Sequence, residues 1–565
     1  MIVPLLAFSL AVIDPLTPQQ ALEAARGLVA ADPARCAMRP IGTSLAGHPI
    51  EMLVLSEQCA TADTRPAVLV VSGIDGNRPS SVGIAVDAAR TLLKDPKQLE
   101  GRTFYIIPCA NPDALLDTSA RAAAQASRNR RAVDEDRDRR SDEDPPRDLD
   151  GDGKIVTMRR IAPPASDPPT HLADPADGRL MRTPDAAKNL RATHTMYTEG
   201  VDSDGDGLVA EDAPGGVDYD RNFPHRWQEF DPNAGAYPLS EPETLAIATF
   251  VISHPRIVSA IVIGKWDNLV ATPDSKGKDI TGKTPLALHG DDQATWEELG
   301  KSWKELSAQS RAEAVDPSGS LALWLYIHRG IPTCATQLWG RPDPSPLPPP
   351  PAPAPADPAA APPPPPPPAP TPPKAADEEA AQWLLWSDRD QAGSGFVAWH
   401  PFDHPTLGKV EIGGFAPRFR SDPPAAEHER LATALAKFAA LLAERSPTCE
   451  LANVTARALS PGLVEIECEI VNNGWLPTAT AMGKTNTAPS PIVLRISSPK
   501  ERLETGKRVT IVETLPGAGG RKAFRWLVRT TPGERITLDC TWTPRGTQRI
   551  AIIDAAVQPG KEILP

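Results

Sequence analysis

The sequence predicts an α/β domain with a mixed sheet, followed by a C-terminal β-sandwich. Between residues 17 and 107, segments with helix and strand patterns alternate, which favours an α/β architecture. From residue 448 onward, short β-rich segments such as LVEIECEIVNN and RITLDCTWT alternate with turn residues, which is typical of a sandwich of about seven strands. With 565 residues, the chain is long enough for two or three domains.

The elements of the α/β domain follow from local patterns. A helix is expected over TPQQALEAARGLVAA, with Thr17 as its N-cap, and a strand over HPIEMLVLS. The further expected elements are a strand at 67–72, a helix at 81–93, a strand at 103–107, a helix at 242–252, a strand at 258–263, a helix near 295–309, a strand at 333–339 and an amphipathic helix at 425–444. Ligand sites in such sheets lie at the carboxyl ends of strands, where Asp75 and Asn111 fall.

The domain boundaries follow from shifts in composition. The predicted units are a signal segment at 1–16, an α/β domain at 17–447 and a β-sandwich at 448–565. Within the α/β domain, residues 128–216 are charged and poor in apolar periodicity, so we expect a surface insertion with two acidic loops. Residues 342–373 are nearly pure Pro and Ala, which predicts a disordered insertion, with a proline-rich ligand segment as the alternative.

Charge and hydropathy exclude several classes of partner. The formal net charge is −13, whereas nucleic acids and anionic lipids require a concentrated basic surface, so no nucleic-acid partner is expected. No segment reaches the roughly 18 apolar residues that a membrane span needs. The apolar start MIVPLLAFSLAVIDP favours a cleaved signal and an extracytoplasmic location, periplasmic or secreted. An apolar N-terminal strand and a misassigned start codon stay open as alternatives.

The cysteines argue against a thiolate metal site. Seven cysteines show no C-x-x-C pair, which excludes the usual thiolate zinc and redox motifs. Cys36 and Cys59 flank a predicted hairpin, and Cys468 and Cys540 lie in predicted strands. One or two disulfides are therefore expected as candidates, with at least one thiol left free.

Several separate segments, in order, resemble the zinc carboxypeptidases of the carboxypeptidase A type. These segments are GTSLAGHPIEMLVLS, GIDGNRP, CANPDAL, GGVDYDRNFPHRW, SEPE and GSLALWLYIHRGIPTCATQLWG. The resemblance covers roughly residues 17 to 447 and implies a mixed-sheet zinc carboxypeptidase-like domain. It also implies a Zn²⁺ held by two His and one Glu, a Glu as general base, and an Arg for the substrate carboxylate.

The residues at the metal and general-base positions depart from that pattern. By the resemblance, the first His position falls on Asp75, the ligand Glu on Arg78, the third ligand on Gly264 and the general base on Gln337. An arginine is always protonated and repels a cation, and a glutamine has no useful basicity. We therefore expect that zinc, the cofactor of the family, is not bound and that the usual peptide hydrolysis is lost.

The binding side of the site is expected to persist. Arg221 matches the carboxylate-binding arginine of the family, with Asp220 in place of the usual asparagine. Arg159 resembles the oxyanion-stabilising arginine, and Tyr326 is placed to cover the pocket. The alternatives are structural roles: a salt bridge from Arg221 to Asp218 or Asp220, and core packing for Tyr326.

A salt-bridged cluster is the expected replacement for the metal. Asp75, Arg78, Lys265 and Asp267 would converge on one small space if the fold is kept. A rebuilt metal site from His400, His404 and Glu411 is the alternative, although Pro401 and Pro405 argue against the helix that would align the two histidines.

Two acidic loops are candidates for calcium. DLDGDGK carries Asp148, Asp150 and Asp152 at alternating positions, and DSDGDG carries Asp202, Asp204 and Asp206. In each loop the sixth position is glycine, as in the first half of an oxygen-ligand Ca²⁺ loop. The twelfth position is not acidic in either loop, although Glu211 and Asp212 stand close to it in the second. A solvated acidic turn is the alternative.

Three functions follow from these observations. The first is a catalytically inactive member of the zinc carboxypeptidase family, a pseudoenzyme, that binds a peptide or protein ligand through a C-terminal carboxylate. The second is an active metallocarboxypeptidase with a rebuilt metal site. The third is a structural or envelope-associated interaction protein with a filled pocket.

Overall fold

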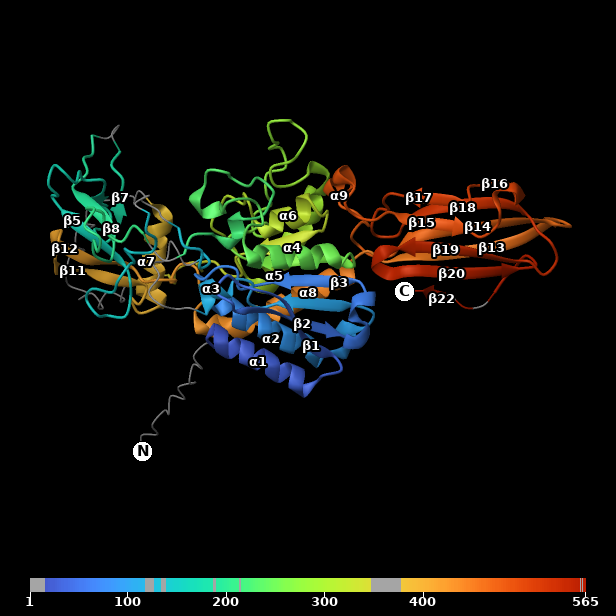
Figure 1. The fold of residues 1–565 in the computed structure, drawn as a ribbon, viewed down its shortest axis with the longest axis horizontal. Helices are drawn as coiled ribbons and strands as arrows, with labels where there is room; N and C mark the ends of the chain where they lie inside the picture. Colours follow the sequence, from blue (N-terminus) through green and yellow to red (C-terminus); the bar gives the residue numbers. More distant parts are fainter. Residues whose placement is uncertain are drawn as a thin grey trace, which may run out of the picture.

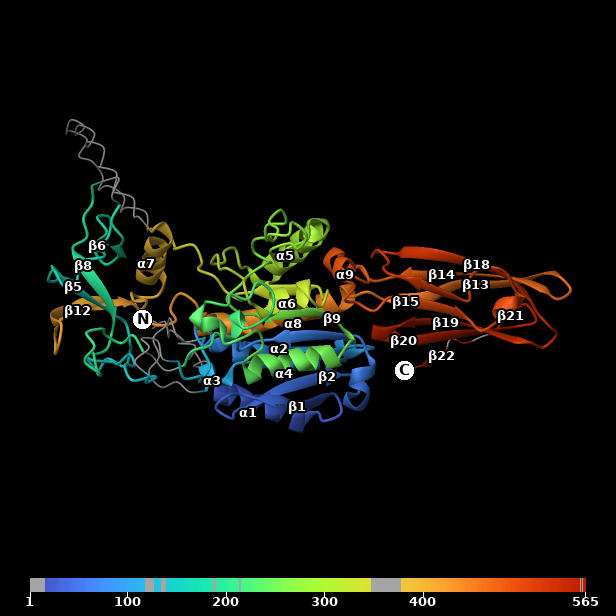
Figure 2. The same ribbon diagram turned by 45° about the horizontal axis from the view of Figure 1, so that its top comes forward.

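The computed structural model describes residues 16–116, 127–133, 139–185, 189–212, 215–346, 377–558, 560 and 562–564. Nearly all of the predicted signal segment 1–16 and most of the Pro/Ala-rich segment 342–373 lie outside these residues. Three parts follow one another along the long axis: a peripheral sheet, a central α/β domain and a C-terminal pair of β-sheets (Figure 1). They keep this order after a turn of 45° (Figure 2).

The central domain is built on a six-stranded mixed sheet, as the sequence predicts. Its strands, in spatial order, are β1 Cys36–Thr43, β2 Pro49–Ser56, β4 Thr103–Ile107, β3 Ala67–Val71, β9 Ile257–Ile263 and β10 Thr333–Thr336. The pairs β1–β2 and β2–β4 are antiparallel, whereas β4, β3, β9 and β10 run parallel. All five residues of β3 are buried, as expected for a strand covered on both faces.

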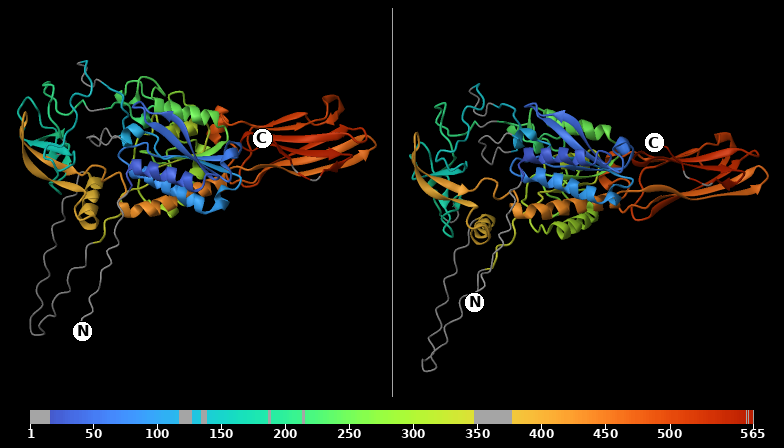
Figure 3. Two further views of the ribbon diagram at one scale, coloured as in Figure 1. Left: turned by 60° about the horizontal axis from the view of Figure 1, so that its bottom comes forward. Right: turned by 90° about the horizontal axis from the view of Figure 1, so that it is seen from below.

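Helices cover both faces of this sheet. The helices are α1 Pro18–Ala31, α2 Ser80–Lys94, α3 Pro112–Leu115, α4 Pro242–Ser253, α5 Gln293–Ser307, α6 Leu321–Ile327 and α8 His428–Arg445. In the views from below, α1, α2 and α8 lie side by side across one face (Figure 3). Thr17 caps α1 as predicted, since its hydroxyl accepts the Gln20 N–H at 3.3 Å.

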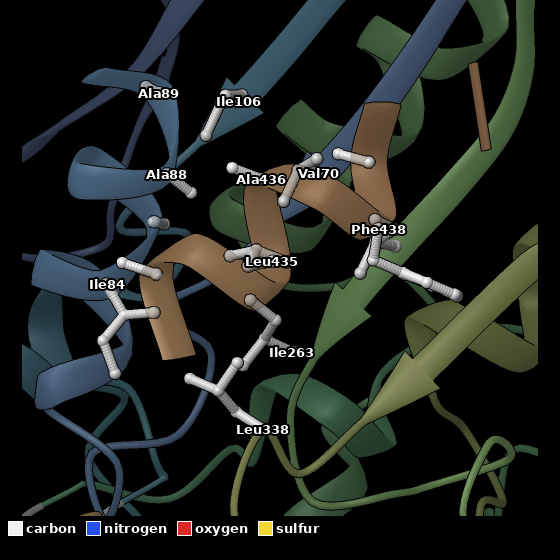
Figure 4. Close-up of a cluster of buried hydrophobic side chains, with 14 of the residues drawn as sticks. Val70, Ile84, Ala88, Ala89, Ile106, Ile263, Leu338, Leu435, Ala436 and Phe438 are labelled. Atoms are coloured by element: carbon white, nitrogen blue, oxygen red, sulfur yellow. The ribbon is translucent and has the colours of Figure 1, made fainter. Parts of the chain in front are cut away.

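Alternate residues of β3 enter two separate cores. Val68 and Val70 pack with α1, α2 and α8, whereas Leu69 and Val71 pack with α4 and α6. Figure 4 shows the first core, where Leu435 and Phe438 of α8 lie close to Val70 of the sheet. Because α8 follows the Pro/Ala-rich segment in the sequence, the chain returns to the central domain after that segment.

The peripheral sheet joins two segments that are far apart in the sequence. Its order is β11 Phe396–His404, β12 Gly408–Phe415, β5 Thr157–Ile161 and β8 His194–Thr198, with α7 Glu378–Asp390 and the short pair β6 Leu172–Ala173 and β7 Met181–Arg182 nearby. Residues 128–216, expected as a charged surface insertion, therefore contribute two strands to an ordered sheet. Each segment supplies only part of the small core of Met158 and Ile412, so neither shows a clear apolar period by itself.

The C-terminal region consists of antiparallel sheets around one core, which confirms the predicted β-sandwich. One sheet contains β13 Cys449–Ser460, β14 Leu463–Asn472, β18 Gly520–Arg529 and β16 Leu503–Thr505. The other contains β17 Val509–Val512, β15 Ile492–Ile496, β19 Arg535–Trp542, β20 Gly546–Ile553, β21 Ala556–Val557 and β22 Glu562–Leu564, and α9 Ala481–Asn486 lies between the sandwich and the central domain. Trp526 and Trp542 are buried in this core.

Two further expectations concern cysteines and the membrane. All seven cysteines are buried and none forms a disulfide, so the candidate pairs Cys36–Cys59 and Cys468–Cys540 are not disulfides. Among the described residues, no helix combines the length and the apolar composition that crossing a bilayer requires.

Candidate functional site

The loop after β3 places Asp75 and Arg78 at the carboxyl end of the central sheet. β3 ends at Val71, and α2 begins at Ser80. The side-chain amide of Asn111, which precedes α3, donates to the Ile74 carbonyl at 3.1 Å and to the Ser127 carbonyl at 2.9 Å. Asn111 thereby holds two chain segments around Asp75, as its position after the neighbouring strand suggests.

Asp75 and Arg78 form a buried ion pair. Asp75 is 2% exposed and Arg78 is 7% exposed, and Arg78 Nη1 contacts Asp75 Oδ2. The other carboxylate oxygen, Oδ1, accepts the Ser127 hydroxyl at 2.7 Å and the Asn77 N–H at 3.0 Å. Burial acts to raise the pKa of Asp75, but the charges of Arg78 and Lys265 outweigh it and leave the pKa below its usual value.

Lys265 extends this ion pair into a larger cluster. It follows the end of β9, and its Nζ lies 2.5 Å from Asp218 Oδ2. Burial opposes the charge of Lys265, but Asp218 and Asp75 more than compensate and raise its pKa. We call Asp75, Arg78, Asp218, Asp220 and Lys265 the Asp75 cluster.

Asp220 is a fully buried carboxylate of the cluster with a raised pKa. Its Oδ1 accepts the Leu321 N–H at 2.9 Å, at the start of α6. Burial and the neighbouring charge of Asp218 raise its pKa to about 6. A Cβ added at Gly264 would lie 3.4 Å from Asp220 Oδ2, so Asp220 takes up the space beside Gly264.

Asp267 does not join the cluster, which corrects part of the expected arrangement. Its carboxylate accepts the N–H groups of Leu269 and Val270, at 2.9 and 2.6 Å. Asp218 and Asp220 take its place as partners of Lys265. The sequence placed these two acids beside Arg221, and only the fold brings them to the end of β9.

Gln337 has a defined structural role at the end of β10. Its side-chain amide donates to the carbonyls of Lys265 and Glu313, both at 2.7 Å, and its Oε1 accepts the Glu313 N–H at 2.8 Å. A carboxylate could not donate to the two carbonyls, so this environment requires an amide. Gln337 thus links the chain after β9 to the segment before α6.

These residues do not fit a zinc ion. Both carboxylate oxygens of Asp75 already have hydrogen-bond or ion-pair partners. The charged groups that act on Asp75 most strongly are the cations Arg78 and Lys265. Among the described residues, the groups of three acids, histidines or cysteines close enough to share an ion all lie in the acidic loops, away from Asp75. The charged groups that neutralise Asp75 are therefore cations, whereas a metal site needs further lone-pair donors there.

Arg221 lies at the edge of the cluster and keeps part of its surface exposed. It ends the short 3₁₀ turn Tyr219–Arg221, and its side chain is 31% exposed. Its partner is Asp231, with Nη1 and Oδ2 3.7 Å apart, rather than Asp218 or Asp220. Gly319, at φ +74°, packs against the Arg221 backbone, where an added Cβ would lie 2.2 Å from the carbonyl oxygen.

The other two predicted substrate-binding residues lie elsewhere. Arg159 is in the peripheral sheet, where its Nε donates to Glu411 at 2.6 Å and its guanidinium lies 4.3 Å from the Trp399 ring. The hydroxyl of Tyr326 donates to Asp292 at 2.7 Å, and Asp292 also accepts the Ala481 N–H of α9 at 2.8 Å. Tyr326 therefore supports the contact between the central domain and the sandwich.

The alternative histidine site is not assembled in the structure. His400 pairs with Asp150, 2.9 Å away, and His404 Nε2 contacts the Gly200 carbonyl at 2.8 Å. Glu411 forms an ion pair with Arg159. These three side chains thus have separate partners.

The two acidic loops lie next to each other beside the peripheral sheet. The Arg147 N–H of the first segment donates to the Glu199 carbonyl of the second at 2.9 Å. In the first loop, Asp148 and Asp150 group with Glu199, and in the second, Asp204 groups with Asp144 and Glu211 and also with Asp202 and Asp206. Burial, together with Asp144 and Asp206, raises the pKa of Glu211 to about 7. The sequence did not indicate Glu199 or Asp144, because neither belongs to the loop that it completes.

A family comparison matches part of the central domain. Residues 22–146 match the family model described as "Zinc carboxypeptidase", a segment that includes β3, Asp75 and Arg78. Residues 22–146 are therefore similar to part of a zinc carboxypeptidase. Residues 448–552 match a model described as a domain of unknown function, DUF8731, which coincides with most of the sandwich. No curated protein sequence matches the chain.

Solved structures of carboxypeptidases are similar over just over half of the chain. Bovine thrombin-activatable fibrinolysis inhibitor, in complex with a tick carboxypeptidase inhibitor, is 14% identical over 57% of this chain and 85% of its own, with a TM-score of 0.35. Carboxypeptidase A from Helicoverpa armigera is 14% identical over 57% of this chain and 64% of its own, with a TM-score of 0.35. A metallo-carboxypeptidase from Burkholderia cenocepacia is 12% identical over 57% and 61%, with a TM-score of 0.28. The chain thus spans about three fifths of the length of the last two.

Proposed function

We propose that this chain is a non-catalytic member of the zinc carboxypeptidase family. The observation that carries the proposal is the buried ion pair of Asp75 and Arg78, in the loop after β3. By the sequence resemblance, these residues stand where the family has metal ligands. The guanidinium of Arg78, three residues after Asp75, is always protonated. It therefore provides the positive charge that zinc provides in an active enzyme.

The environment of Gln337 supports the same proposal. By the resemblance, this residue stands at the general-base position, and its amide is fully used by the backbone of Lys265 and Glu313. A general base needs an ionisable lone pair free to take a proton from water. Metal binding and proton abstraction are therefore both absent from the proposed site.

A binding function is favoured by Arg221. Its guanidinium is 31% exposed, and its ion pair with Asp231 is long, at 3.7 Å, so a ligand carboxylate can compete for it. Lys265, in the Asp75 cluster, has 29% of its side chain exposed. The ligand that suits these cations is a peptide with a free C-terminal carboxylate.

The test measures metal, turnover and binding on the same protein. Inductively coupled plasma mass spectrometry should find no stoichiometric zinc, and peptides with free C-termini should stay intact with or without added zinc. Zinc at one equivalent with hydrolysis that a chelator abolishes would refute the proposal and favour the active alternative.

The binding arm has matched variants within the chain. Thermal stabilisation by peptides should require a free rather than an amidated C-terminus and should be lost in Arg221→Ala. Arg226→Ala is the control, because Arg226 has the same 31% side-chain exposure and its own aspartate partner, Asp316. An equal loss of peptide stabilisation in both variants, or no stabilisation by any peptide, would contradict the binding function. The structural role with a filled pocket would then be the remaining alternative.

A further inference from the structure

The second acidic loop is completed by carboxylates from outside its sequence motif. Carboxylate oxygens of Asp144, Asp204 and Glu211 lie within 4.8 Å of one another, and Asp204 is also within that distance of Asp202 and Asp206. We call these five residues the Asp204 cluster. They come from two segments, because Asp144 precedes the first acidic loop whereas the other four belong to residues 202–211.

Asp144 is a buried carboxylate of this group, and one of its two oxygens has no hydrogen-bond donor. It is 0% exposed, and its Oδ1 accepts the Ser203 N–H at 2.5 Å. Its Oδ2 is buried and receives no hydrogen bond from an N–H or hydroxyl donor in the described part of the chain, and the same holds for Glu211 Oε2. Asp144 and Glu211 contact each other, and a hydrogen bond between two carboxyl groups requires a proton on one of them. Buried oxygens of this kind cost free energy unless a donor or a cation satisfies them.

The charged neighbours that raise the pKa of Glu211 have the same sign as Glu211 itself. The charges that act most strongly on Glu211 are those of Asp144 and Asp206, and both are negative. A bound cation would neutralise these groups and satisfy the two unpartnered oxygens together. The crowding of the acids thus points to a ligand rather than to a solvated turn.

The first acidic loop shows what a satisfied arrangement looks like. Glu199, also 0% exposed, accepts the Leu149 N–H at 2.7 Å with one oxygen and the Val156 N–H at 2.9 Å with the other. Asp150 has His400 as a partner at 2.9 Å. Both loops close by the same turn hydrogen bonds, in which Asp148 and Asp202 each accept two glycine N–H groups. The difference lies in the added acids, because Glu199 has an N–H donor for each oxygen, whereas Asp144 and Glu211 each keep one oxygen without such a donor.

We propose that the Asp204 cluster binds one calcium ion, with Asp144 and Glu211 completing the DSDGDG loop. The donors are all oxygens and four of the five lie in one loop segment, which suits the 6–8 oxygen ligands and flexible geometry of Ca²⁺ better than the strict octahedron of Mg²⁺. The ion links residues 142–147 to residues 202–211, next to the paired strands β5 and β8. This site is independent of the proposed carboxylate binding.

The test is calcium titration of the chelator-treated full-length protein, followed by calorimetry and hydrogen–deuterium exchange. Calcium should bind with saturation and should slow exchange in residues 142–147 and 199–212, whereas magnesium should have little effect. Asp144→Asn and Asp204→Asn should each weaken the affinity at least tenfold. Asp148→Asn, the equivalent change in the first loop, should bind calcium as the wild type does.

Several outcomes would overturn the proposal. One is the absence of saturable binding up to about 10 mM calcium, beyond the weakest range of protein calcium loops. Another is a loss of binding in Asp148→Asn but not in Asp144→Asn, which would assign the ion to the first loop. Because Asp144 is buried, its variant is compared by circular dichroism, and the partly exposed Asp204 gives the same test if Asp144→Asn does not fold.

Discussion

The Asp75 cluster and the Asp204 cluster both gather carboxylates, but they balance the charge differently. In the Asp75 cluster, three acids meet the cations Arg78 and Lys265, and the pKa of Asp220 is raised to about 6 by burial and by Asp218. In the Asp204 cluster, the loop aspartates accept backbone N–H groups, and buried oxygens of Asp144 and Glu211 have no N–H or hydroxyl donor among the described residues.

This difference in charge compensation indicates which cluster of acids is stabilised by a bound cation. Carboxylates that have fixed cations or several N–H donors are stable without one, and a metal would have to displace those partners. Carboxylates that are buried together without such partners gain most from a cation. Acid content alone does not separate the two cases, because both clusters are rich in aspartate.

The largest expected effect comes from removing the internal cation of the Asp75 cluster. Arg78→Met leaves Asp75 buried without its nearest counter-charge and should lower the free energy of unfolding by about 3–5 kcal/mol, measured by urea denaturation. Arg90→Met is the matched control, because Arg90 has the same spacing to Asp87 but both side chains are more than a third exposed. We expect a loss below about 1 kcal/mol there.

The double variant Asp75→Asn/Arg78→Met separates charge from packing. It should recover part of the stability lost in Arg78→Met, since no unpaired charge remains. Equal losses in Arg78→Met and Arg90→Met would contradict the view that the buried pair neutralises itself.

A smaller effect is expected from adding an uncompensated carboxylate next to the cluster. In Gln337→Glu, a carboxylate oxygen replaces the NH₂ group that donates to the carbonyls of Lys265 and Glu313. The free energy of unfolding should therefore fall by about 2–3 kcal/mol near neutral pH. The loss should shrink in acid, where a protonated Glu can donate one hydrogen bond. Gln19→Glu, at an exposed position of α1, is the control and should be close to neutral. A fully stable Gln337→Glu protein would argue against the structural role of the amide.

The smallest effect concerns the pH dependence of Asp422. Burial raises the pKa of this carboxyl to about 7, although it accepts hydrogen bonds from the N–H and hydroxyl of Ser80 and lies near Arg418 and Arg78. Between about pH 4 and about pH 7 the folded state holds a proton that the unfolded state has lost, so the free energy of unfolding falls as the pH rises.

Partial exposure limits this contribution to about 2 kcal/mol. Urea unfolding over that pH range should show a flatter profile for Asp422→Asn than for the wild type. Asp403→Asn changes a carboxylate whose side chain is 84% exposed and should leave the profile as it is. An unchanged profile in Asp422→Asn would mean that this carboxyl ionises as it does in solvent.

Local patterns predicted the elements better than the site. The helix capped by Thr17, the buried strand β3 and the antiparallel sandwich follow from periodicity and capping, which act over short distances. The pairing of Asp75 with Arg78 was also predictable, because the two residues belong to one loop. The peripheral sheet was missed because β5 pairs with β12, which lies beyond the Pro/Ala-rich segment.

The sequence by itself determined the order of the secondary-structure elements and placed Asp75 and Arg78 together in the loop after β3. The tertiary structure alone decided which acids are neutralised: it brought Asp218 to Lys265, gave Asp267 to backbone N–H groups, and placed Asp144 beside Asp204 and Glu211. The reason is that charge compensation depends on distance and burial, and both are set by contacts between segments far apart in the chain.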